Sequence, residues 1–371
     1  MTVVDIHILQ TVPPSNINRD DTGSPKTANF GGTRRARVSS QAWKRATRKA
    51  FGGVVDTRDL GVRTKQVVEL IGDQIVQMSA ETSQKDAYGM AEKVLDAAGI
   101  KLVAPRKKKG EQEGTHESGY LVFLARHQIE NLAELALSSD GAVDKRAAKA
   151  AVNSDNSVDV AAFGRMVADD AELNVDAAVQ VAHAISVHKV DNEFDYFTAV
   201  DDRKAAADET GAGMIGTVEF SSSTLYRYAT VNVTGLRENL GDEAAAARAL
   251  RAFVDAFVTS MPTGKQNTFA NRTLPDAVVV QVRSSQPVNL VGAFEEAVVA
   301  EGGRGRLAVA AERLVSHARR IDTAYGTAPV ASFVVSANAA TSAVETLGDV
   351  VSLAGLLDGV VESVAARREP A

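Results

Sequence analysis

The residues best suited to chemistry lie in one basic stretch near the start of the chain. Residues 22–55 carry eight Lys and Arg side chains and no Asp or Glu, whereas the whole chain has a formal net charge of −6. Five of the eight are Arg, whose planar guanidinium pairs well with phosphate oxygens. Most basic helix faces are merely solvated, but here no nearby acid neutralises the cations. The stretch therefore indicates a phosphate-binding surface.

A helix is expected to position these cations. Ser39 and Ser40 are N-cap residues for a helix that runs through Ala50. At 100° per residue, a packing face of Ala42, Trp43, Ala46 and Ala50 lies beside an arc of about 140° that is polar and basic. That arc holds Gln41, Lys44, Arg45, Arg48 and Lys49. The cluster Arg34, Arg35 and Arg37 precedes the helix, behind a Gly31-Gly32 turn that lets backbone N–H groups approach a ligand closely.

A different chemistry is conceivable at Asp20 and Asp21, which follow Arg19 in a loop. Two adjacent carboxylates can hold a divalent ion for phosphodiester cleavage. Adjacent carboxylates in a loop are more often part of a turn or paired with a nearby Arg. A metal-dependent endoribonuclease using Asp20 and Asp21 is the enzymatic alternative.

Several other motifs are weak. Residues 211–216 fit G-x-G-x-x-G, but they follow an acidic turn and lead into a strand-like segment, which argues against a dinucleotide site. His183 and His188 are five residues apart and fall on different helix faces, so metal binding is not expected. Met166 follows Phe163-Gly164-Arg165 in a loop, where it would either press on a base or fill a core gap. The run at 106–109 is expected to be a solvated loop.

Composition restricts the remaining function classes. The 371 residues contain no Cys, which excludes disulfides, thiolate nucleophiles and Cys-ligated zinc. We expect a cytoplasmic location, because the sequence does not start with a signal peptide and its longest uncharged run is broken by Pro and Gly. No cofactor is expected.

The remaining chain indicates an α+β fold. A strand is expected from Val3 to Leu9, and residues 56–181 favour helices without an intervening strand, at 60–79, 86–98, 120–137 and 144–151. A second strand at 195–200, a polar excursion at 201–216 and a returning strand at 217–233 predict a protruding hairpin or loop. A helix follows Gly241, and further strands are expected at 277–282 and 331–336, with helices at 293–300, at 306–321 and at the C-terminal end.

With the helical insert and the excursion set aside, the order strand, helix, strand, strand, helix, strand matches the split βαβ arrangement of ferredoxin-like and RNA-recognition folds. The aromatic strand on which RNA-recognition motifs stack bases is absent from the sequence. Base stacking on the sheet is therefore not supported.

The chain resembles the CasC-type backbone subunit of Cascade, the type I-E CRISPR surveillance complex. The resemblance rests on Asn18-Arg19-Asp20-Asp21, on the segment from Phe30-Gly31-Gly32 through Lys49, on 197–202 (FTAVDD), and on Gly264-Lys265-Gln266. These motifs are well separated, occur in the family's order and extend over almost the whole chain.

The resemblance implies a right-hand shape. Its palm is of RNA-recognition type and comprises residues 1–55, 182–200 and 218–371 with C-terminal helices; its helical fingers are residues 56–181, and its thumb loop is residues 201–217. Several copies would assemble head to tail along a guide RNA, beside other Cascade subunits, and present it to target DNA. No membrane partner is implied.

The resemblance also implies residue roles. The expected guide-RNA contacts are Arg19, Arg35, Arg37, Ser39, Ser40, Gln41, Lys44, Arg45, Arg48, Lys49, Gly264 and Lys265. Met166, Phe197, Thr198, Ala199 and Val200 match positions that press on displaced nucleotides. Lys145, Arg146 and Lys149 match finger cations that hold DNA. The expected function is that of a non-enzymatic RNA-binding subunit; the alternatives are the Asp20/Asp21 ribonuclease and a general coat protein for single strands.

Overall fold

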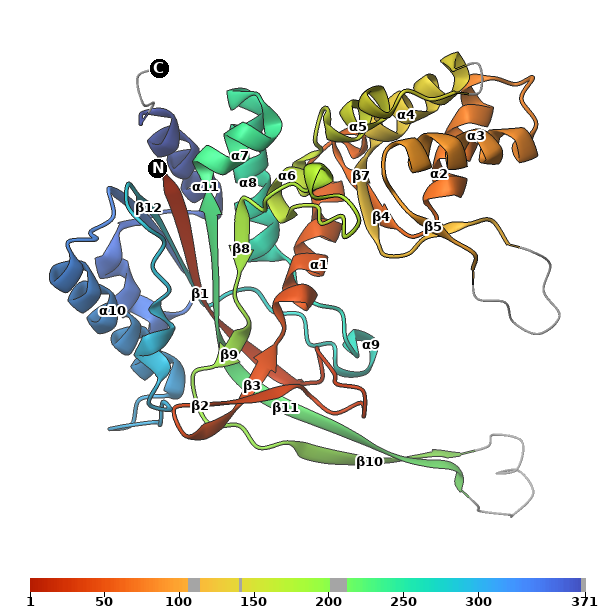
Figure 1. Ribbon diagram of the computed structural model, residues 1–371. Coiled ribbons are helices and arrows are strands. Elements are labelled where there is room, and N and C mark those ends of the chain that lie inside the picture. Colours follow the sequence, from red (N-terminus) through yellow and green to blue (C-terminus); the bar gives the residue numbers. More distant parts are fainter. Residues whose placement is uncertain (106–113, 140–141, 201–211, 368–371) are drawn as a thin grey trace. The chain divides into compact units, whose positions relative to one another are not determined.

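The computed structural model describes residues 1–105, 114–139, 142–200 and 212–367 (Figure 1). The chain is a mixed α+β protein that divides into two compact units. Unit 1 comprises Met1–Ala50, Val181–Val231 and Phe253–Ala371, and unit 2 comprises Phe51–Gln180 and Asn232–Ala252. Unit 2 thus contains most of the segment expected to form the fingers, and it adds 232–252, which the sequence had assigned to the palm.

A large mixed sheet forms the body of unit 1. Its strands follow the order β14-β13-β12-β1-β11-β9-β3-β2, with β8 and β10 also paired to β11. Strand β1 is antiparallel to β12, with Val3 opposite Arg283, and β12 is antiparallel to β13. The strands expected from Val3, at 277–282 and at 331–336 are confirmed. The strand bounds are β1 (Val3–Ser15), β2 (Thr27–Phe30), β3 (Thr33–Val38), β8 (Val179–Val181), β9 (Ala184–Ser186), β10 (Glu193–Val200), β11 (Ala212–Asn232), β12 (Ala277–Arg283), β13 (Ala331–Ser336) and β14 (Asp349–Val350).

Helices cover both faces of this sheet. Helix α10 (Arg306–Tyr325) shares a core cluster with Leu9, Tyr226 and Tyr228 of the strands. Because successive side chains of a strand point to opposite faces, Arg227 points away from α10. It lies against Trp43 of α1 (Ser40–Ala50) and Phe257 of α8 (Glu243–Thr259). The other helices in unit 1 are α9 (Gln266–Phe269) and α11 (Leu353–Ala365).

A buried ion pair lies in the sheet beside the α10 core. Arg283 donates from Nε to Asp5 Oδ2 at 3.1 Å and from a terminal nitrogen to Asp322 Oδ1 at 2.9 Å. Tyr228 donates its hydroxyl to Asp5 Oδ1 at 2.8 Å. Every charge in this group therefore has an opposite partner, as buried charges require.

Strands β10 and β11 extend beyond the sheet as a two-stranded arm (Figure 1). Their antiparallel register runs from Glu193 opposite Phe220 to Val200 opposite Ala212, with a shift at Ala199. Strand β11 is 21 residues long, so one continuous strand serves both the sheet and the arm. The predicted pair of strands is confirmed, but the returning strand begins at Ala212 rather than at 217. The rest of the predicted thumb loop, residues 201–211, lies outside the described residues.

Unit 2 has a helical core of its own, which includes Ile71, Val94 and Leu132. The helices expected at 86–98 and 144–151 are confirmed. The expectation that no strand interrupts the helices is wrong, because β4 pairs with β7 and β5 pairs with β6. The element bounds are α2 (Val67–Met78), α3 (Gln84–Ala97), α4 (Arg126–Ser138), α5 (Lys145–Asn153), α6 (Val158–Phe163), α7 (Val233–Leu240), β4 (Gly61–Thr64), β5 (Leu102–Val103), β6 (Glu117–Ser118) and β7 (Val122–Ala125).

Two predictions near the C-terminal end are also wrong. The helix expected at 293–300 is a short 3-10 segment at Leu290–Phe294. After this segment the chain packs beside β9: Val298 is buried, and its N–H donates to Val187 O at 2.9 Å. The final amphipathic pattern is divided into a 3-10 segment, the short strand β14 and α11. Gly348 lies between the 3-10 segment and β14. The backbone packs so closely there that a Cβ would lie 2.4 Å from Ser332 O, so only glycine fits.

Candidate nucleic-acid interface

Helix α1 begins where the sequence predicts. Ser39 is buried and accepts a hydrogen bond at Oγ from Ala42 N at 3.3 Å, as an N-cap residue does. The Ser39 N–H donates to Asn18 Oδ1 at 2.8 Å, which ties the start of α1 to the loop before Arg19. Trp43 and Thr47 are buried on the inner face. The hydroxyl of Ser39 therefore positions the helix and is already engaged.

The outer face of α1 carries one exposed row of polar side chains. Gln41, Arg45 and Lys49 are exposed and lie four residues apart, hence on one line along the helix. We call these three residues the α1 ridge. Ser40, Lys44 and Arg48 are half-buried beside it. Burial lowers the pKa of Lys44, because its ammonium loses hydration.

Arg35 does not belong to this surface. Its side chain is buried, and its guanidinium donates to the carbonyl oxygens of Phe30, Ser186, Phe294 and Glu295 at 2.9 to 3.2 Å, and to Thr33 Oγ1 at 2.8 Å. Burial lowers its pKa and nearby Glu295 counteracts that effect. The prediction that Arg35 binds phosphate is wrong, because its donors already hold β3 to its neighbours.

Arg37 and Arg19 retain more access to solvent. Arg37 is half-buried and donates from Nε to Thr27 O at 3.1 Å, with a terminal nitrogen 3.2 Å from His183 Nδ1. Burial, and then the charge of Arg37, lower the pKa of His183, so this imidazole is neutral beside the guanidinium. Arg19 is exposed on the loop that leads to Asp20.

The loop at 263–270 lies against the same N-terminal segment. A Cβ on Gly264 would lie 2.3 Å from Ile17 O, so only glycine permits this contact. Lys265, half-buried, takes a left-handed conformation with φ of 52°, which is rare for a residue other than glycine. Phe269 packs on Phe220 with ring centroids 5.9 Å apart. The structure thus brings Gly264 and Lys265 to the loop that also fixes the start of α1.

Asp20 is used within a turn. Its Oδ1 accepts hydrogen bonds from Thr22 N at 3.0 Å, Thr22 Oγ1 at 2.7 Å and Ser24 N at 3.0 Å. The Thr22 hydroxyl and then the backbone N–H groups lower the pKa of Asp20. Among the described residues there is no group of three His, Cys, Asp or Glu side chains suited to a metal ion.

The arm carries exposed aromatic side chains. Phe197 is 36% exposed and its ring covers Gly216 opposite, where a Cβ would lie 2.5 Å from Cζ. Phe194 and Tyr196 are 67% and 64% exposed on the other face of the arm. Thr198 is exposed, and Ala199 and Val200 continue β10. The sequence had singled out Phe197 but not Phe194 or Tyr196, although their alternation with charged residues marks them as surface aromatics.

In unit 2, Met166 is 78% exposed. This excludes the gap-filling role, because a gap-filling Met would be buried, and contact with a base stays a prediction. The preceding Arg165 is buried and donates to Leu173 O at 2.7 Å, Gln128 Oε1 at 3.0 Å and Asn153 Oδ1 at 2.8 Å. Gly164 has φ of 77° and packs where a Cβ would lie 2.7 Å from Val175 O. A fixed turn thus holds Met166 at the surface.

The three cations of α5 differ in availability. Lys145 and Arg146 are exposed. Lys149 forms ion pairs at 2.6 Å with both Asp170 and Glu172, and these two carboxylates raise its pKa. Lys149 is therefore engaged within the chain, and its role in holding DNA stays a prediction.

The residues of the weak motifs lie in other structural contexts. Gly213 and Gly216 lie in β11, with no helix opening after them as a dinucleotide site needs. His188 is held by Lys189 O and by Thr224 N. The basic run at 106–109 falls outside the described residues. In the part of the chain that the structure describes, no helix has the length and apolar character to span a bilayer.

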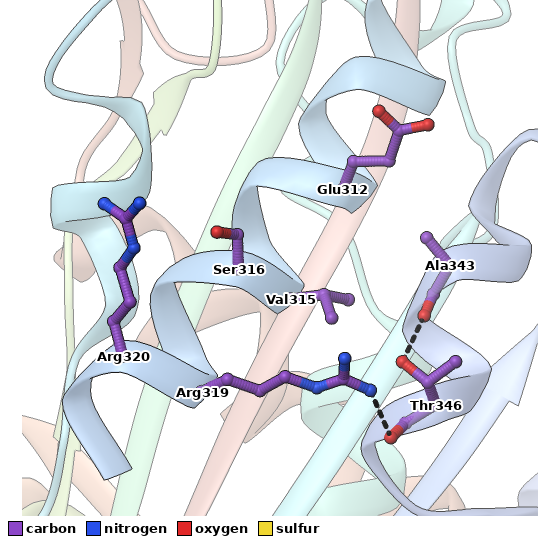
Figure 2. A pocket seen from close by; sticks show the side chains of 7 residues that line it. All are labelled: Glu312, Val315, Ser316, Arg319, Arg320, Ala343 and Thr346. Carbon is purple, nitrogen blue, oxygen red and sulfur yellow. Dashed lines mark hydrogen bonds between the residues drawn. The ribbon is translucent and has the colours of Figure 1, made fainter. Parts of the chain in front are cut away.

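A separate groove lies between α10 and the 3-10 segment Ala339–Leu347 (Figure 2). Val315 and Ala343 are among its apolar lining residues, and Arg319 and Arg320 lie along it. Arg319 donates to Thr346 O at 3.4 Å. These two exposed arginines belong to unit 1 but not to the α1 ridge, so they provide a charge-matched control for it.

Comparison with known proteins places the whole chain in a family. A family model of CT1975-like Cas proteins matches residues 4–359. A chain from a solved "CRISPR RNA-guided surveillance complex, pre-nicking" is 34% identical, with a TM-score of 0.85 and coverage of 97% of this chain and 99% of that chain. A chain from another "CRISPR RNA-guided surveillance complex" is 30% identical, with a TM-score of 0.75 and the same coverage. No curated protein sequence matches. The chain therefore belongs to the CT1975-like family of Cas proteins, and its resemblance to a CasC-type Cascade subunit is confirmed.

Proposed function

We propose that this protein is the guide-RNA-binding backbone subunit of a type I-E Cascade complex and that it acts without catalysis. The α1 ridge carries the proposal. It consists of two exposed cations and an amide in a stretch of thirty-four residues that contains no acid. Arg48 and Lys49 lie in the last turn of α1, where the negative end of the helix dipole stabilises cationic side chains.

Contacts to phosphates carry no sequence information. A ridge that holds the sugar-phosphate chain leaves the base edges free, so the guide itself can read a target by base pairing, as in other RNA-guided systems. The large sheet would then be the palm of RNA-recognition type, and exposed Lys145 and Arg146 would contact target DNA.

The arm would be the thumb that reaches a neighbouring copy in a head-to-tail filament. Its exposed Phe197 and Thr198, together with Met166 of unit 2, would press on nucleotides displaced at regular intervals along the guide. A heterologous contact that does not close on itself builds such a helical filament. Cytoplasmic localisation follows from the same role.

The experiment expresses the protein with a guide precursor and its partner subunits and identifies the nucleic acid that co-purifies. Wild-type protein should retain an RNA of defined length and sequence, whereas Arg45→Glu/Lys49→Glu should lose it and Arg319→Glu/Arg320→Glu should keep it. A heterogeneous mixture of nucleic acids bound by wild type would favour the coat-protein alternative.

Cleavage of complementary RNA in Mg²⁺ that disappears in Asp21→Ala would favour the ribonuclease alternative. Against that reading, Asp20 already accepts three hydrogen bonds from its own turn. Loss of the guide by both double variants alike would contradict a specific role for the α1 ridge.

A further inference from the structure

A buried cation lies directly beneath α1. Arg227 of β11 is 1% exposed, and its neighbours Tyr226 and Tyr228 point into the core on the α10 side. Its own side chain therefore points to the face covered by α1. The guanidinium carbon lies 3.8 Å from the ring centroid of Trp43 and 4.6 Å from that of Phe257. Arg227 is thus enclosed between two aromatic faces.

All the groups that hold this cation are neutral. Arg227 donates to Gln10 Oε1 at 2.6 Å and to the carbonyl oxygen of Phe257. Its Nε has no hydrogen-bond acceptor, and within the described part of the chain no carboxylate pairs with it. The contrast is Arg283, which is equally buried but lies between Asp5 and Asp322. Burying a charge without an opposite partner costs free energy of folding. The ion pairs of Arg283 offset this cost, whereas Arg227 has no such compensation.

The charge is present at neutral pH. Burial lowers the pKa of Arg227 to about 9, which still leaves the guanidinium protonated near pH 7. Trp43, whose ring the cation faces, lies on the inner side of α1, while Arg45 and Lys49 are exposed on the outer side. An α-helix with its side chains is about 10 to 12 Å across. Since the guanidinium lies 3.8 Å beyond the Trp43 ring and a phosphate would lie beyond the ridge side chains on the opposite face, the two charges would be about 17 Å apart.

We propose that Arg227 is a positioning residue of the guide-binding site: it seats α1 through Trp43 and adds an uncompensated positive charge that attracts the phosphates without touching them. This inference rests on the proposed function. At about 17 Å and an effective dielectric constant of about 20, one such charge changes affinity about fivefold. The interaction passes through the protein rather than through solvent, so salt screens it less than a surface contact.

The test compares two kinds of variant by their dependence on salt. Arg45→Ala removes a direct contact, so it should weaken guide binding and flatten the plot of log K against log salt by about 0.7. Arg227→Met keeps the volume but removes the charge. It should lower affinity about fivefold and leave the slope unchanged, because it displaces no counterion. Arg227→Lys keeps the charge and should bind within about twofold of wild type.

Trp43 is the only tryptophan in the sequence, so its fluorescence reports how α1 is seated. Arg227→Met should retain the emission of a buried indole, with loss of any quenching by the cation. If Arg227→Met does not fold, Arg227→Gln replaces it, since its planar amide can lie on Trp43 and still donate to Phe257 O. Thermal unfolding of each free variant gives the stability cost separately.

Two results would overturn the proposal. One is a charge-free variant with buried Trp43 emission and wild-type affinity. The other is a loss of affinity with the slope flattened as in Arg45→Ala, which would mean that Arg227 acts only by seating α1 for direct contacts and that its charge does not itself attract the phosphates. If Arg45→Ala itself changes neither affinity nor slope, the guide does not lie on α1 and the proposed function fails. The Arg227 proposal fails alone when Arg45→Ala has its effect and the Arg227 variants have none.

Discussion

The double variant Arg45→Ala/Lys49→Ala tests the α1 ridge most directly. Both side chains are exposed, and neither is paired with a carboxylate in the described part of the chain. Removing them therefore breaks no ion pair inside the free protein. Alanine also favours a helix at both positions. The free variant should accordingly unfold at about the wild-type temperature, and any change in guide binding reports contacts with RNA.

The expected size follows from counterion release. Each phosphate neutralised on a single strand contributes about 0.7 to the slope of log K against log salt. Losing two contacts should flatten the slope by about 1.4, and at about 0.1 M salt this corresponds to about 25-fold weaker binding, or about 2 kcal/mol. The difference should vanish as salt approaches about 1 M, where release of ions no longer favours the complex.

The assay is guide-RNA binding by fluorescence anisotropy over a series of salt concentrations, with two RNAs of unrelated sequence. Both RNAs should lose the same factor, since phosphate contacts do not read bases. Arg319→Ala/Arg320→Ala removes the same charge from α10 and is the control. An unchanged slope in the ridge variant, or equal losses in ridge and control variants, would refute the reasoning.

Four further predictions concern single residues. Arg35→Met should destabilise the free protein by about 2 to 4 kcal/mol in urea unfolding, because it strands buried carbonyl oxygens, and should leave the salt slope unchanged. Burial lowers the pKa of His7 from 6.5 to about 3, so between these pH values only the unfolded chain takes up a proton. The free energy of unfolding should therefore fall as the pH drops below about 6.5, by about 2 kcal/mol at pH 5. The raised pKa of Asp5 acts in the opposite sense, so the measurement is the difference between wild type and His7→Gln, which should lose this part of the pH dependence. Gly264→Ala should cost about 1 to 3 kcal/mol and weaken guide binding relative to the neighbouring Thr263→Ala, because its Cβ would push the loop away from Ile17. Met166→Ala should leave the unfolding temperature unchanged, since the side chain is 78% exposed, yet reduce 2-aminopurine fluorescence at displaced guide positions.

The sequence predicts local features of this protein better than long-range ones. The cap at Ser39, the polar row on α1 and the strands at 277–282 and 331–336 follow from spacing alone, because each depends on neighbours in the chain. Arg35 and Arg45 look alike in the sequence. What separates them is β9 and the segment around Phe294, which supply carbonyl oxygens to Arg35 from more than a hundred residues away. No spacing rule contains that information.

The same limit explains the missed elements. The strand β4 is four residues long and is stabilised by pairing with β7, about sixty residues later. The ion pairs of Lys149 could not be predicted, because its acidic partners lie in the segment 170–172, beyond the reach of an i, i+4 rule. Arg227 lies in a strand pattern among tyrosines, and nothing local in the sequence shows that Trp43 lies over it.

Strand β10 has one edge that remains unpaired within the described part of the chain, because it pairs only with β11. Open edges invite the same strand of another molecule, which leads to aggregation. Glu193 and Asp195 sit on this strand, so two arms brought edge to edge would oppose negative charges. Free molecules are thus discouraged from joining through the open edges of their arms.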